Sequence, residues 1–126
     1  MTVLTRRYVI FGSLLAAVAV IAGALGSHAL RGVLSPKMMA AYQVAVQYHF
    51  YHALGLLAVA GVAAQVRDRR WVKWAGVAML LGILLFSGSL YLLSLTGIRW
   101  LGAITPLGGL SFILAWVMLA VAAHKG

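Results

Sequence analysis

Imidazole and phenol groups gather in one short segment of an otherwise apolar chain. The segment QYHFYHALG, residues 47–55, places two histidines and two tyrosines at the start of a long apolar run. Such groups can transfer protons, hold a metal ion or bind a polar ligand. The chain has no cysteine and only one acidic residue, Asp68, which excludes thiolate chemistry and paired-carboxylate catalysis. Any proton transfer therefore depends on the tyrosines and on His28, His49, His52 and His124.

The composition is that of an integral membrane protein. Of the 126 residues, 64% are hydrophobic and 9% are charged, which leaves too few polar side chains to cover a soluble core. The lipid bilayer is therefore the expected partner. The net charge of +9 comes from basic clusters beside apolar runs rather than from one basic face, so no nucleic-acid partner is expected.

Four stretches are long enough to cross the bilayer, because about 20 helical residues span its core of about 30 Å. They run over residues 8–27, 45–65, 71–95 and 106–123. The first stretch also resembles a secretory signal, but its full length favours a retained span. We therefore predict an all-α, integral membrane four-helix bundle that forms a single domain over residues 1–126.

The basic residues predict the orientation of the chain. Seven of the 10 Lys and Arg residues fall on the side of the termini, and three fall on the other side. The positive-inside rule then places the N- and C-termini in the cytoplasm, in a multi-pass protein of the inner (plasma) membrane. On the outer side, Ser35-Pro36 and Thr105-Pro106 each predict a capped helix start.

Polar side chains from all four spans are predicted to meet in the outer part of the membrane. With a rise of about 1.5 Å per residue, His49 and His52 lie about 5 and 10 Å below the outer edge. An outer-facing pocket with Arg31 or Arg99 at its mouth would suit an amphipathic ligand. The candidate polar layer comprises His28, Gln47, Tyr48, His49, His52, Ser87, Tyr91 and Ser111.

Four motifs follow one another in the order found in a known family. They are GALGSHAL (23–30), YHFYHALGLL (48–57), LFSGSLYLL (85–93) and LGAITPLGG (101–109). They resemble the YgdD/YwdK-like small membrane proteins, domain of unknown function 423 (UPF0382). The resemblance covers nearly the whole chain and implies four transmembrane helices in one domain, without implying an activity. One departure is Ser27 before His28, where relatives usually have alanine.

The leading hypothesis is a structural or accessory bundle that self-associates or joins a larger membrane complex. Hydroxyl, imidazole and small-residue positions would then serve helix packing. The alternative is binding or transport of a lipid, quinone or anion in the outer pocket around His28 and His52. Three imidazoles without a carboxylate or thiolate are a weak metal or haem signal, so no metal or cofactor is expected. No enzyme is expected either, because Ser87 and Ser89 lack a histidine–carboxylate relay.

Overall fold

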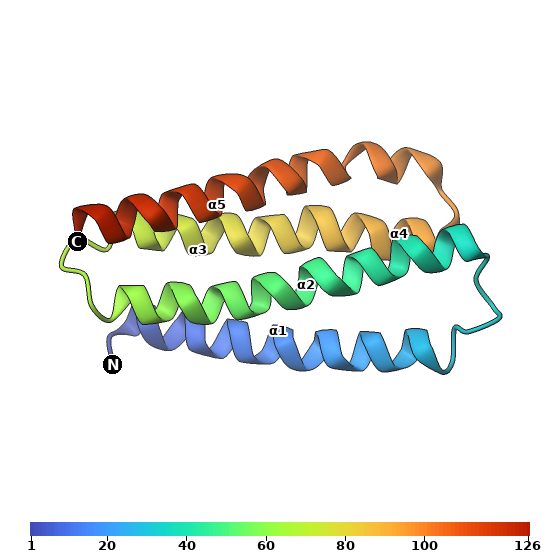
Figure 1. Ribbon diagram of the computed structural model, residues 1–126, viewed down its shortest axis with the longest axis horizontal. Helices are drawn as coiled ribbons and strands as arrows, with labels where there is room; N and C mark the ends of the chain where they lie inside the picture. The colour runs from blue at the N-terminus through green and yellow to red at the C-terminus, as the bar shows by residue number, and fades with distance from the viewer.

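The computed structural model describes all 126 residues and is entirely helical. Helices α3, η1 and α4 follow one another without a break and form one long rod, so the chain makes four rods in all (Figure 1). The elements are α1 (Val3–Ser27), α2 (Pro36–Ala63), α3 (Arg70–Gly82), the π-helix η1 (Ile83–Ser87), α4 (Gly88–Thr96), the 3-10 helix η2 (Arg99–Ala103) and α5 (Thr105–Lys125).

Successive rods run antiparallel to one another, and α2 packs against all the others. Both termini and the α2–α3 loop lie at one end of the bundle (Figure 1). We call this the basic end, because Arg7, Arg69, Arg70, Lys73 and Lys125 line its hollows. Helix α1 packs mainly on α2, α5 packs mainly on α3, and α2 joins the two pairs through its contacts with α3 and α4.

Three of the four rods are long and apolar enough to cross a membrane: Val3–Ser27, Arg70–Thr96 and Arg99–Lys125. Helix α2 is not among them, because Gln47 and the histidines and tyrosines that follow it lower its hydropathy. Its packing against α1, α3 and α4 nevertheless aligns it with helices that can span. The prediction of an all-α membrane four-helix bundle is confirmed.

The tightest core lies where α2 meets α3 and α5. Leu56, Val59, Val72 and Met79 are fully buried there. Small residues allow close approach elsewhere: a Cβ added at Gly12 of α1 would lie 2.9 Å from the Ala53 carbonyl oxygen of α2. Large apolar side chains remain exposed along α1 and α5, as expected where the surroundings are lipid rather than water.

The two predicted helix caps had different outcomes. The Ser35 hydroxyl accepts a hydrogen bond from the Met38 N–H at 3.2 Å, so the cap of α2 is confirmed. At Thr105-Pro106 the predicted helix start is confirmed, with Pro106 in the first turn of α5, but the predicted cap was wrong, because Thr105 is already the first residue of the helix and no side chain caps it. Its hydroxyl instead lies 2.6 Å from the Ser89 hydroxyl, which ties the start of α5 to α4.

Candidate functional site: the polar layer around His52

His52 is buried between α2 and α5, with both ring nitrogens occupied. Its Nδ1–H donates to the Tyr48 carbonyl at 2.8 Å, which leaves Nε2 to accept from the Trp116 indole N–H at 3.0 Å. The imidazole also stacks on the Phe112 ring, with centroids 3.5 Å apart. These partners select the neutral Nδ1–H tautomer. No nitrogen lone pair is left for a metal ion.

His49 lies one turn away and faces α4 instead. Its Nδ1 is 2.8 Å from the Tyr91 hydroxyl, and the side chain is only 4% exposed. His49 is therefore buried between α2 and α4 rather than open at the surface of the bundle. Its Nε2 is buried without a hydrogen-bond partner, so one donor or acceptor in this layer is unsatisfied within the chain.

Two serine hydroxyls donate hydrogen bonds to backbone carbonyls of neighbouring helices. The Ser87 hydroxyl donates to the Ala45 carbonyl of α2 at 2.8 Å, and the Ser111 hydroxyl donates to the Ala78 carbonyl of α3 at 2.7 Å. Both serines are buried. Ser87 ends the π-helix η1, where the regular backbone pattern is interrupted. Just beyond it, Ser89 donates to the Phe86 carbonyl at 3.0 Å.

Three further bonds between helices involve residues outside the predicted layer. The Tyr8 hydroxyl donates to the Lys73 carbonyl at 2.7 Å, and the Tyr42 hydroxyl donates to the Ala22 carbonyl at 2.5 Å. Trp116, the partner of His52, was also missed. Its position in the middle of a span was an available signal, because an indole N–H within hydrocarbon needs an acceptor from the protein.

The eight predicted residues do not form one site. His28 is exposed at the end of α1, and no hydrogen bond from its ring is formed. Gln47 and Tyr48 are exposed on α2. The other five are buried or half-buried, and their polar atoms bond to other helices or to the same helix: His49, His52, Ser87, Tyr91 and Ser111.

Within the bundle, His52 lies beside the middle turns of α1, because Gly12 of α1 packs on the carbonyl of the neighbouring residue Ala53. The depth of the layer in the membrane stays a prediction.

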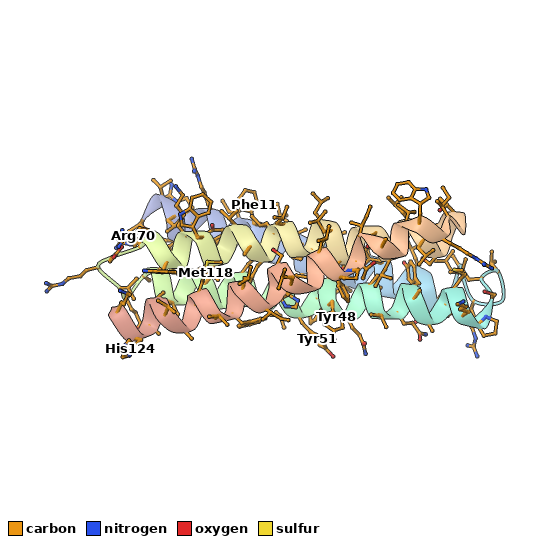
Figure 2. The ribbon with its side chains drawn as sticks, turned by 90° about the horizontal axis from the view of Figure 1, so that it is seen from above. Phe11, Tyr48, Tyr51, Arg70, Met118 and His124 are labelled. Atoms are coloured by element: carbon orange, nitrogen blue, oxygen red, sulfur yellow. The ribbon has the colours of Figure 1, made fainter.

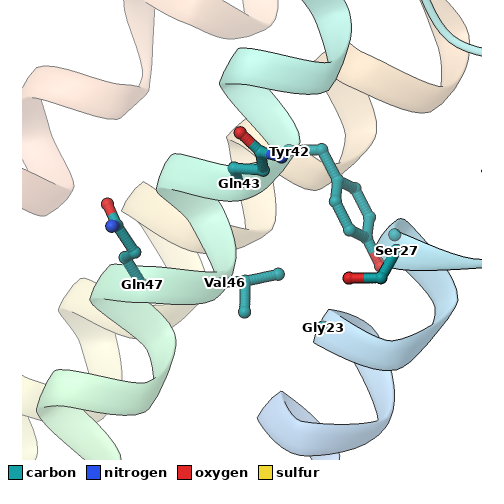
Figure 3. A pocket seen from close by; sticks show the side chains of 7 residues that line it. Gly23, Ser27, Tyr42, Gln43, Val46 and Gln47 are labelled. Atoms are coloured by element: carbon teal, nitrogen blue, oxygen red, sulfur yellow. The ribbon is translucent and has the colours of Figure 1, made fainter. Parts of the chain in front are cut away.

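The predicted outer pocket is not formed. A hollow of about 280 Å³ opens between α1 and α2 toward the end of the bundle opposite the basic end (Figure 3), but Gln47 is its only predicted member. His28, His52, Tyr91 and the serines lie elsewhere. The hollow is lined by Gly23, Gly26, Ser27, Tyr42, Gln43, Val46 and Gln47. The polar side-chain atoms of His52, Ser87, Tyr91 and Ser111 are already bonded within the bundle, so these four residues contribute to packing between helices.

Comparison with known proteins places the chain in a family. The model of a family described as "Protein of unknown function (DUF423)" matches residues 22–109. The chain belongs to this family. The resemblance found in its motifs is thus confirmed, and the DUF423 match covers the glycine-, histidine- and serine-containing segments around the polar layer.

Relatives extend the similarity to nearly the whole chain. UPF0382 membrane protein YwdK of Bacillus subtilis is 50% identical over 120 residues, which cover 95% of this chain and 98% of YwdK. UPF0382 membrane protein SH2409 of Staphylococcus haemolyticus is 46% identical over 120 residues, covering 95% of this chain and 97% of that protein. These descriptions are of membrane proteins of unknown function and name no activity. No solved structure matches the chain.

Proposed function

We propose that this DUF423 protein is a structural or accessory bundle of one domain, which self-associates in the plasma membrane through the lipid-facing side of α2. The observation that carries the proposal is a polar stripe, Gln43, Gln47 and Tyr51, on that side of the helix. All three residues are exposed, and Tyr51 is 53% exposed. Figure 2 has Tyr51 pointing away from the helices, near the middle of the bundle's length.

The depth of the stripe makes its exposure unusual. Gly12 of α1 packs on Ala53, and Gly26 of α1 packs on the Tyr42 ring. Gln47 and Tyr51 lie between these two contacts, and therefore alongside the spanning part of α1. A polar group facing hydrocarbon costs several kcal/mol when it is unsatisfied. A protein partner on this face would remove that cost.

A second copy of the chain suits the stripe because its groups are self-complementary. A carboxamide carries both a donor and an acceptor, so Gln47 can pair with Gln47 of a copy across a two-fold axis. The stripe carries no charge that would call for an opposite charge on a different partner. Interhelical bonds of this kind contribute about 1 kcal/mol each in membranes.

Replacing Gln47 with leucine should weaken self-association in lipid about tenfold, because the paired amides are lost. The matched control is Gln65→Leu, which changes an exposed glutamine just beyond the C-terminal end of α2, away from the stripe, where it bonds only to the Gly61 carbonyl. The measurement is the fraction of dimers in vesicles at increasing protein density, read by single-molecule photobleaching. A wild-type chain that stays monomeric at every density would contradict self-association. If a different protein bound this face in a fixed ratio, the chain would be an accessory subunit of a larger complex, and the partner at the stripe would not be a second copy.

Both termini are expected in the cytoplasm, because the basic end carries most of the positive charge of the chain. The absence of cysteine gives a clean test of this orientation. A single cysteine introduced at Gly126 should be protected from a membrane-impermeant maleimide in intact cells, and one at Val33 should react. If only the cysteine at position 126 were labelled, the chain would have the opposite orientation, with its termini outside the cytoplasm.

A further inference from the structure

Two hollows at the basic end meet at Arg70. One, of about 310 Å³, lies between α3 and α5 and is lined by Arg70, Trp71, Trp74, Met118 and Lys125. The other, of about 460 Å³, lies between α1 and α3 and is lined by Val3, Leu4, Arg7, Arg69, Arg70 and Lys73. We call them the Arg70 hollows. Together they bring five cationic side chains around the first turn of α3.

The positive charge in the Arg70 hollows is held in place but hardly neutralised. The Arg69 guanidinium donates from Nε to the Ala63 carbonyl at 3.0 Å. Lys125 Nζ lies 6.0 Å from the centre of the Trp71 ring, within the range of a cation–π contact. The only acidic side chain, Asp68, is 3.4 Å from Arg70 with both side chains largely in solvent, and such pairs contribute little.

The start of α3 also favours an anion. Arg70 is the first residue of α3 and lines both hollows, so the positive end of the helix dipole lies between them. Asp68 accepts a hydrogen bond from the Arg70 N–H at 3.0 Å, and the N-cap residue Arg69 adds no side-chain cap. Basic pockets between transmembrane helices are known binding places for anionic lipid headgroups.

We infer that the Arg70 hollows bind one phospholipid that carries two phosphates, a diphosphatidylglycerol. Each hollow takes one phosphate, and Arg70 contributes to both because its guanidinium has five donors in a fixed fork. The apolar walls formed by Trp71, Trp74 and Met118 then lie beside the acyl chains. This combination of charged rim and apolar wall distinguishes a lipid from free phosphate, which would gain nothing from the walls.

The opposite end of the bundle provides a built-in control. There a hollow of about 310 Å³ is lined by Lys37, Met38, Leu93 and Arg99. It has the same volume as the hollow between α3 and α5 and also carries two cations, but it lacks aromatic walls. It also lacks a neighbouring hollow that shares an arginine. Specific binding of a two-phosphate lipid is therefore expected at the basic end only.

Native mass spectrometry of the full chain in mild detergent tests the site. Tetraoleoyl diphosphatidylglycerol should bind one per chain, with an apparent affinity about tenfold above that of dioleoyl phosphatidylglycerol supplied at equal charge. Dioleoyl phosphatidylcholine should bind without saturating, and inorganic phosphate should not compete. Equal binding of the two anionic lipids at equal charge would overturn the proposal, as would competition by inorganic phosphate.

Substitutions locate the binding. Arg70→Gln and Lys125→Gln should each lower the affinity for diphosphatidylglycerol about tenfold, whereas the control Arg99→Gln should leave it unchanged. Lys125 is exposed in the last turn of α5, so its substitution leaves the fold intact even where Arg70→Gln lowers stability. If Arg99→Gln and Lys125→Gln lowered the affinity for diphosphatidylglycerol equally, the lipid would not bind at a defined site at the basic end, and the proposal would be overturned.

Discussion

Replacing Gly108 with alanine should lower the free energy of unfolding of the bundle by about 3 kcal/mol. Gly108 of α5 packs directly on Phe86 of the π-helix η1. An added Cβ would overlap the Phe86 backbone nitrogen and would lie 2.7 Å from its Cα. Backbone cannot turn aside as a flexible side chain can, so α5 and η1 would have to separate, and the neighbouring contact between Gly82 and Phe112 would loosen with them.

The adjacent residue supplies the matched control. A Cβ added at Gly109 would first meet the Phe86 ring at 3.7 Å, which is an ordinary contact, so Gly109→Ala should be close to neutral or slightly stabilising through its better helix propensity. Thermal unfolding of both variants in the same mild detergent measures the difference. Equal midpoints for Gly108→Ala and Gly109→Ala would show that α5 is not fixed against η1 at this point.

The rods of the bundle could be predicted because bilayer thickness alone sets their length. The apolar stretches 8–27, 71–95 and 106–123 correspond to α1, to the α3–α4 rod and to α5, and Ser35 marks the start of α2 through a local hydrogen bond. Such features depend on neighbouring residues in the sequence. They need no knowledge of which helix packs on which.

The partners within the polar layer could not be predicted, because they depend on the rotation of each helix about its axis. His52 and Trp116 are 64 residues apart, and hydropathy gives no reason to face them together. The π-helix adds a second obstacle. It inserts an extra residue into the α3–α4 rod and changes the direction of every side chain beyond Ser87, including Tyr91, which meets His49.

His28 failed to join the layer for a simpler reason. It follows the last residue of α1 as the C-cap, where the chain leaves the helix and turns toward α2. Its position along α1 did not determine where the ring points. The same limit applies to Gln47, which shares a helix with His49 and His52 but lies on the exposed side.

Replacing His52 with alanine should destabilise the bundle by about 3 kcal/mol, because three contributions are lost together. The Trp116 N–H loses its acceptor within the membrane, the stacked contact with Phe112 disappears, and a cavity remains between α2 and α5. His124→Ala is the control, since that histidine is exposed in the last turn of α5 and should change the unfolding midpoint very little.

A double-mutant cycle separates the hydrogen bond from the packing. Trp116→Phe removes the indole N–H and keeps an aromatic ring, so it should cost about 1 kcal/mol. In the background of His52→Ala the same substitution should cost less, because the acceptor is already absent, and this difference is the coupling energy of the pair. A coupling energy near zero would mean that the His52–Trp116 bond does not hold α2 to α5.

If His52→Ala left stability unchanged but abolished stabilisation by an added amphipathic ligand, the polar layer would be a binding site and not the means of holding the four rods together.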